Sequence, residues 1–150
     1  MKIYIDADAC PVTGIIEDTA REFNLSCYIV SDHNHALGSN YCEVITVDAG
    51  FDAADLKIVN MIDNYDILIT QDYGLATIAL SKNVYVLNHF GKEYTHANID
   101  ILLDQRYLAA KIRNSKSKYR LKGPSKRLVA DDDKFRSELI KLIERIQGEE

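Results

Sequence analysis

Five short apolar runs, rich in β-branched residues, alternate along this chain with stretches that have the spacing of amphipathic helices. The runs cover residues 3–5, 27–30, 44–47, 67–70 and 84–87. Strands that alternate with helices are typical of an α/β fold, because each helix returns the chain so that the next strand can pair in parallel. The alternation therefore predicts a single three-layer domain with a mostly parallel five-stranded sheet.

Helical patterns fill most of the gaps and follow the last run. The expected helices cover residues 11–23, 53–62, 73–81, 95–107 and about 131–147. Pro11 suits a first helical turn, and Thr95 can cap the fourth helix. Three acids at 131–133 can cap the last helix and favour the positive end of its dipole.

The segment between the second and third runs, residues 31–41, is polar and too short for a convincing crossover helix. Whether these two strands pair in parallel is therefore left open. No repeat or domain boundary interrupts the pattern, so residues 1–150 are expected to form one domain with a proper core.

Basic residues are concentrated in one segment, an arm at 111–128. Between positions 111 and 127 there are eight of the 18 basic residues and no acid, whereas all 23 acids lie elsewhere. Such segregation suits an acidic site beside an arm that grips a polyanion, although a solvated loop would give the same charge run. The arm begins at Lys111, and the residues expected to bind nucleic acid are Arg113, Lys116, Lys118, Arg120, Lys122, Lys126 and Arg127.

Several classes of protein do not fit the composition. No apolar run approaches the ~20 residues of a membrane span, and the first residues lack the pattern of a signal peptide. The three cysteines, Cys10, Cys27 and Cys42, are too few and too irregularly spaced for a disulfide framework or a zinc knuckle. A cytoplasmic protein without membrane partners is expected.

Acids stand where the expected strands end. Four of the five runs are followed by an acid and the fifth by Asn88; the acids are Asp6, Asp32, Asp48 and Asp72. Asp also starts helices by capping backbone donors, and Asp32 is assigned only that role. Parallel strands bring their carboxyl ends to one edge, where α/β proteins bind ligands. Asp6, Asp48 and Asp72, with Asp8 beside them, are therefore expected to converge.

The second expected helix contributes two more acids, Asp52 and Asp55, which lie on the same side of one turn. Asp52 is expected to cap the helix. Asp55 precedes Val59 by four residues and so belongs to the stripe that faces the core, where a carboxylate needs a partner. Oxygen ligands favour Mg²⁺ or Mn²⁺. The expected metal ligands are Asp6, Asp8, Asp55 and Asp72.

Five segments resemble the bacterial YaiI/YqxD family of uncharacterised proteins, in order from about residue 3 to residue 145. They read "IYIDADACPV", "GFDAADLKIVNMI", "ILITQDYGLATIALSKN", "GKEYTHANIDILLDQR" and "KGPSKR". That family is grouped with the PIN-like fold. The resemblance implies that Asp6, Asp55 and Asp72 occupy the positions of the catalytic, metal-binding acids of PIN nucleases. The fourth PIN acid is missing after Asp72, and Asp8 or Asp48 is its candidate substitute.

These observations favour a metal-dependent nuclease, with RNA a better candidate substrate than DNA. A catalytically silent nucleic-acid-binding module is one alternative. The other is a phosphatase that resembles the haloacid dehalogenases, with Asp6 as the nucleophile, Asp8 as the general acid and Thr70 in the second motif. The sequence "VYVLNHF" lacks the acids of that family's last motif, and its lysine, Lys82 or Lys92, is unassigned.

Three features stay open at this level. His33 and His35 are spaced to reach one ion, but two histidines without a close third ligand are also typical of a solvated loop. Arg106 faces either solvent or the acidic edge. The sequence does not indicate an oligomeric state.

Overall fold

The computed structural model describes residues 1–8, 10–32, 39, 41–48, 50, 52–114 and 126–149. The strands are β1 (Lys2–Asp6), β2 (Ser26–Asp32), β3 (Glu43–Val47), β4 (Ile67–Ile69), β5 (Tyr85–Leu87) and β6 (Glu93–Tyr94). The helices are α1 (Thr13–Glu22), α2 (Ala53–Met61), α3 (Tyr73–Ser81), α4 (His96–Asn114) and α5 (Val129–Glu149).

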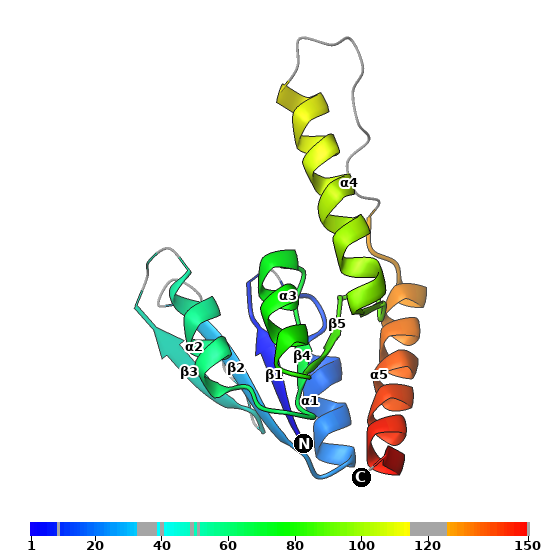
Figure 1. The fold of residues 1–150 in the computed structure, drawn as a ribbon. Coiled ribbons are helices and arrows are strands. Elements are labelled where there is room, and N and C mark those ends of the chain that lie inside the picture. The colour runs from blue at the N-terminus through cyan, green and yellow to red at the C-terminus, as the bar shows by residue number, and fades with distance from the viewer. Residues whose placement is uncertain are drawn as a thin grey trace.

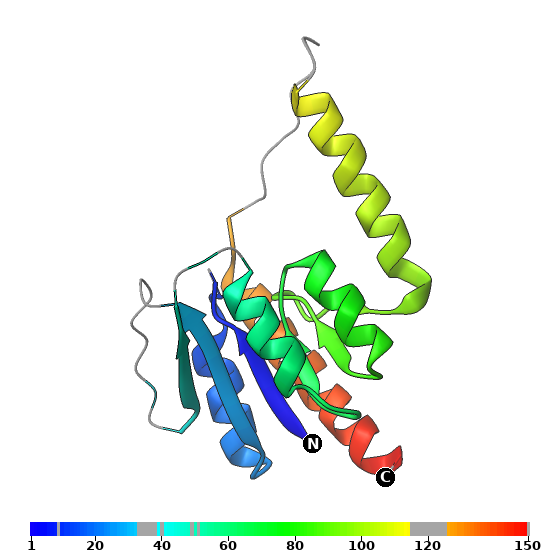
Figure 2. The same cartoon turned by 60° about the vertical axis from the view of Figure 1, so that its left-hand side comes forward.

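The strands form one sheet in the order β3-β2-β1-β4-β5-β6. All neighbours pair in parallel except β5 and β6, which are antiparallel. Helices α1 and α5 cover one face, and α2, α3 and the start of α4 cover the other (Figures 1 and 2). The predicted three-layer α/β fold with a mostly parallel sheet is confirmed.

The central strand β1 explains why the apolar runs are continuous. Ile3 and Ile5 belong to the core beneath α1 and α5, whereas Tyr4 belongs to the core beneath α2 and α3. The ring of Tyr4 stacks on that of Tyr28 on β2, with centroids 5.2 Å apart. A strand covered on both faces buries every side chain, so its sequence shows no polar alternation.

One feature of the sheet differs from the prediction, and another answers a question that the sequence left open. The sheet has six strands rather than five, because Glu93–Tyr94 adds a short antiparallel edge that no apolar run announces. Strands β2 and β3 do pair in parallel, with Tyr28 opposite Glu43 and Asp32 opposite Val47. The parallel pairing that the sequence left open is therefore settled.

Both C-terminal helices depart from their expected bounds. Thr95 caps α4 as expected, since its Oγ1 accepts a hydrogen bond from the Asn98 N–H and its own N–H donates to Asn98 Oδ1. Helix α4 continues to Asn114, so the basic arm starts within it. Helix α5 begins at Val129, because Asp131 reaches back from the first turn to the Leu128 N–H instead of preceding the helix.

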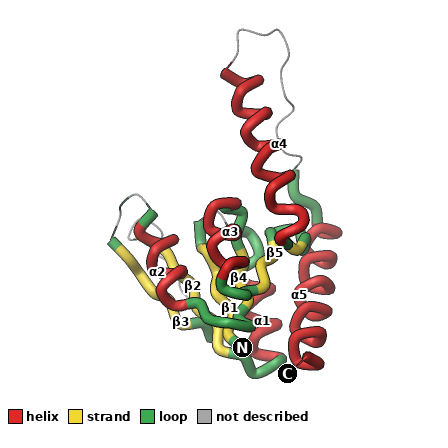
Figure 3. Tube along the Cα trace, in the orientation of Figure 1, coloured by secondary structure: helices red, strands yellow, loops and turns green. Residues whose placement is uncertain are grey.

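The far half of α4 extends away from the body of the domain, beyond the ends of α2 and α3 (Figure 3). None of the helices in the described ranges is both long enough and apolar enough to span a membrane.

Candidate metal and phosphate site

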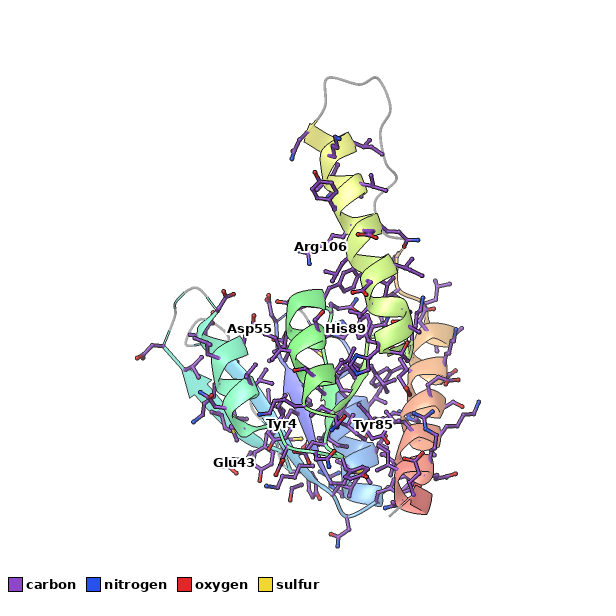
Figure 4. All side chains as sticks on the ribbon, in the orientation of Figure 1. Tyr4, Glu43, Asp55, Tyr85, His89 and Arg106 are labelled. Atoms are coloured by element: carbon purple, nitrogen blue, oxygen red, sulfur yellow. The ribbon has the colours of Figure 1, made fainter. Side chains whose placement is uncertain are left out.

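An acidic cleft lies beyond the carboxyl ends of β1 and β4, beside the first turns of α2 and α3. Its volume is about 580 Å³. Figure 4 shows Asp55 at this edge, with Arg106 extending toward it from α4. The acids that line the cleft are Asp6, Asp8, Asp32, Asp52, Asp55 and Asp72.

Asp6 ends the central strand, is 9% exposed and is held by a neighbouring strand end. Thr70, which follows β4, donates from its hydroxyl to Asp6 Oδ2 over 2.7 Å. The same hydroxyl accepts the Asp72 N–H at 3.0 Å, so one threonine links two acids. Burial raises the pKa of Asp6, and the carboxylates of Asp72 and Asp8 raise it further, against the lowering effect of hydrogen bonds from Thr70 and the Asp8 backbone.

Asp72 both starts α3 and lines the cleft. Its Oδ1 accepts the backbone N–H groups of Gly74, at 2.8 Å, and Leu75, at 3.1 Å. A Cβ atom at position 74 would lie 3.2 Å from this oxygen, so glycine lets the carboxylate sit close to the backbone. Asp72 therefore caps α3, as aspartates at strand ends often do for the next helix, and the capping hydrogen bonds fix the orientation of its carboxylate.

Asp55 approaches the same point from the first turn of α2. Burial raises its pKa from 3.8 to about 7, with further contributions from the Asp72 and Asp6 carboxylates, a hydrogen bond with Asp72, and the charge of Asp52. Asp55, Asp6 and Asp72 all line the same cleft. The fold thus brings together Asp6, Asp55 and Asp72, the three acids selected from the sequence, from three separate segments.

Asp52 was expected to cap α2, and that expectation is wrong. It stands at the N-cap position with a left-handed backbone, φ 59°, and its side chain makes no capping hydrogen bond. An N-cap side chain reaches the helix amides from an extended backbone, whereas the left-handed conformation leaves the Asp52 carboxylate lining the cleft. No sequence signal distinguishes these two outcomes.

The other acids divide between the cleft and its surroundings. Asp8 is exposed and lines the cleft, as expected from its place after Asp6. Asp32 also lines it, so the sequence-based prediction that Asp32 serves only a turn is wrong. Asp48 is exposed and is not among the described residues that line the cleft, so it does not supply the missing fourth acid there.

The cleft fits a divalent cation in donor chemistry and in charge. Its acidic donors are carboxylate oxygens, which Mg²⁺ and Mn²⁺ prefer over nitrogen or sulfur. Among the described residues, no group of three or more His, Cys, Asp or Glu side chains is already arranged around one ion position. Since Mg²⁺ is commonly held by one or two carboxylates and keeps several waters, two facing acids such as Asp55 and Asp72 are a sufficient protein contribution.

Arg106 and Tyr73 also line the cleft. The guanidinium carbon of Arg106 lies 5.7 Å from the centre of the Tyr73 ring. The Tyr73 ring also meets the edge of Tyr94, with centroids 5.7 Å apart and planes at 72°. The question left open for Arg106 is thereby answered: it faces the acidic edge. Neither residue had a signal in the sequence, because the direction of α4 decides the contact.

The basic arm is only partly described. Arg113 is exposed near the end of α4, and Lys126 is exposed before α5. Arg127 is anchored, because its Nε lies 2.7 Å from Asp132 Oδ1 and its guanidinium carbon lies 4.9 Å from the centre of the Phe90 ring. The remaining residues of these predictions, Lys116, Lys118, Arg120, Lys122, His33 and His35, lie outside the described residues.

The chain is similar to several known proteins over nearly its whole length. A family model described as "Uncharacterized BCR, YaiI/YqxD family" matches residues 4–145. A UPF0178 protein of Clostridium acetobutylicum is 43% identical over 145 residues, which cover 97% of this chain and 98% of that protein. A UPF0178 protein of Natranaerobius thermophilus is 45% identical over 148 residues, with 99% of each chain covered. No solved structure gives a significant match.

Proposed function

The chain belongs to the YaiI/YqxD family, as its motifs predict, and from its acidic cleft we propose that it is a PIN-like, divalent-metal-dependent nuclease. The observation that supports this proposal most directly is the meeting of Asp6, Asp55 and Asp72. These residues come from the end of β1, the start of α2 and the cap of α3. Acids from such distant segments have no structural need to face one another.

The electrostatics of the cleft favour a bound cation. Asp6 and Asp55 both have raised pKa values, and each lies near the charge of Asp72. Without a cation, this repulsion is relieved only by retaining a proton on Asp55 near neutral pH. A divalent ion bound between two of these acids would relieve it with the carboxylates ionised.

The protein groups are suited to hydrolysis of a phosphodiester. When bound, a divalent ion would supply positive charge at the phosphate and favour ionisation of the attacking water. Two backbone N–H groups orient Asp72, and the Thr70 hydroxyl orients Asp6. The basic arm would bind the phosphate backbone beyond the cleft. We expect RNA to be cleaved faster than DNA of the same sequence.

Two other functions make different use of the same residues. A silent binding module would retain the basic arm and lack turnover, in keeping with the missing fourth acid. The phosphatase alternative requires a lysine beside Asp6, yet none of the described residues that line the cleft is a lysine. Lys82 instead donates from Nζ to the Val59 carbonyl oxygen over 2.7 Å. The cleft therefore favours the nuclease over the phosphatase.

Cleavage of a labelled RNA oligonucleotide in Mn²⁺, with Asp72→Asn and Asp18→Asn as paired variants, tests the proposal. Asp18 is an exposed acid on α1 whose pair with Arg21 is a surface contact. We expect cleavage by the wild type and by Asp18→Asn, and loss of cleavage in Asp72→Asn and in EDTA. Tight, salt-sensitive binding without cleavage would indicate the silent module, whereas phosphomonoester turnover with beryllofluoride trapped on Asp6 would indicate the phosphatase.

A further inference from the structure

Arg106 is the one positively charged side chain among the described residues that line the acidic cleft. It comes from α4, the helix that extends beyond the sheet edge, and Figure 4 shows it reaching from α4 toward the side where Asp55 lies. An arginine on a different helix from the acids thus lines the same cleft as six carboxylates. This arrangement suits an anionic ligand that binds both the arginine and a cation held by the acids.

The guanidinium of Arg106 does not neutralise any of these acids. Within the described part of the chain it forms no ion pair within 4.0 Å and no hydrogen bond, and its contact is with the face of Tyr73. The guanidinium carries five N–H donors, and none of the described residues accepts a hydrogen bond from them. Their planar fork matches two oxygens of one phosphate, a geometry that lysine does not reproduce.

Tyr73 keeps this guanidinium over the cleft. The residue directly follows Asp72, so its backbone is fixed by the cap of α3. Its ring is supported by the edge of Tyr94, itself only 2% exposed on β6. A ring held in this way offers a fixed surface for a cation–π contact, which limits the positions that the long arginine side chain samples. Tyr73 is thus a positioning residue for Arg106.

We infer that Arg106 is a substrate-binding residue that grips a backbone phosphate of a single-stranded nucleic acid across the cleft from Asp55 and Asp72, an inference that rests on the proposed function. The volume of about 580 Å³ is that of a small-molecule site. We expect a short stretch of extended strand to enter it more readily than a double helix. The substrate class is therefore single strands and unpaired ends.

Binding of a short labelled single-stranded RNA in Ca²⁺, followed by fluorescence anisotropy, tests this inference without requiring cleavage. We expect Arg106→Ala to weaken binding by about tenfold or more, and Arg106→Lys to restore only part of the loss, because the fork is missing. The dependence of log Kd on log salt should also become shallower by about 0.7 when one phosphate contact is removed. Arg136→Ala, which removes an exposed arginine of α5, is the matched control and should bind as the wild type does.

Tyr73 variants separate positioning from contact. Tyr73→Phe keeps the ring and should bind like the wild type, whereas Tyr73→Leu should lose part of the affinity and make a further Arg106→Ala change less costly than it is in the wild type. Far-UV circular dichroism and thermal unfolding establish that each variant is folded. A duplex of the same sequence should bind at least about tenfold more weakly than the single strand.

The outcomes distinguish this inference from the proposed nuclease. Equal affinity of the wild type and Arg106→Ala, no binding by the wild type, or equal affinity for duplex and single strand would overturn the inference. Cleavage that does not depend on Arg106 would support the proposed nuclease activity and contradict the inferred role of Arg106 in binding phosphate. Binding that depends on Arg106 without any cleavage in Mn²⁺ would support the inferred role of Arg106 and contradict the proposed nuclease activity.

Discussion

Asp66 and Asp6 are both buried acids of the central strands, yet they lie at opposite ends of the sheet and have different partners. Asp66, 4% exposed, precedes β4 at the amino end of the strands. Its Oδ1 accepts the Lys2 N–H at 2.9 Å, and its Oδ2 accepts the Asp63 N–H at 2.8 Å. The carboxylate thus ties the start of β1 to the turn between α2 and β4.

Asp6, at the carboxyl end of β1, is close to other acids instead. Thr70 is its side-chain donor, and the charges of Asp72 and Asp8 oppose its ionisation. The comparison teaches that burial alone does not identify a functional acid. A buried carboxylate that accepts two backbone hydrogen bonds stabilises the fold, whereas one close to other carboxylates would gain most from a bound cation.

The largest expected effect that tests the contrast between Asp6 and Asp66 is on the rate of RNA cleavage. Asp6→Asn should lower the rate of RNA cleavage by about 100-fold or more, because an amide is a poor ligand for Mg²⁺ or Mn²⁺. The same change should leave the melting temperature unchanged or raise it, because it removes a charge that burial and neighbouring acids disfavour. Single-turnover kinetics and calorimetry measure the two effects. Retained cleavage, or a large fall in melting temperature, would mean that Asp6 acts like Asp66.

Asp66→Asn should show the opposite pattern. An amide offers one acceptor oxygen in place of two, so one buried backbone N–H loses its partner at a cost of about 2 kcal/mol. The free energy of unfolding from urea titration should fall by about that amount, while cleavage per folded molecule stays unchanged. Asp63→Asn is the matched control, since the hydrogen bond that its side chain accepts from the Asn64 N–H is exposed. Loss of cleavage in folded Asp66→Asn would contradict the division of roles.

The raised pKa of Asp55 leads to a prediction of how pH affects stability in the absence of divalent ions. Its pKa is about 7 in the folded protein and 3.8 ordinarily, so the folded chain retains a proton that the unfolded chain has released between these values. The stabilisation from this group is full below the ordinary pKa and is lost as the pH rises through about 7. In EDTA, Asp55→Asn should therefore melt above the wild type at pH 8 and by a clearly smaller margin at pH 5. A gap that is the same at both pH values would rule out this cause.

The smallest expected effect concerns the hydroxyl that links two acids. Thr70→Val removes the donor to Asp6 Oδ2 and the acceptor of the Asp72 N–H. The pKa of Asp6 should rise further, so cleavage should fall by less than about tenfold at neutral pH and more strongly at acidic pH. Thr70→Ser keeps the hydroxyl and should restore the wild-type pH profile. An unchanged acidic limb in Thr70→Val would show that this bond does not tune Asp6.

Elements with a strong local pattern could be predicted, and those that depend on distant partners could not. The five apolar runs predicted five strands, and Thr95 marked the start of α4. The two-residue strand β6 was missed because an edge strand this short needs no apolar periodicity. The bounds of α5 shifted because an acid in a first turn can reach back to the N-cap as well as stand at it.

The site divides in the same way. Asp6 and Asp72 were predicted because parallel strands end at a common edge, and Asp55 because of its place on the core-facing stripe of α2. Asp52 was misread, since only its backbone conformation decides whether it caps the helix or lines the cleft. Arg106 could not be assigned, because nothing near it in the sequence indicates the direction in which α4 leaves the sheet.

The sequence by itself determined the alternation of strands and helices, the acids at the strand ends and most helix starts, because these follow from side-chain periodicity and from bonds between near neighbours. Only the tertiary structure decided that β1 lies beside β4, which joins Asp6 to Thr70 across 64 positions. It also decided that α4 sets Arg106 against the acids. Strand order and helix direction arise from packing over the whole core, and no local segment contains that information.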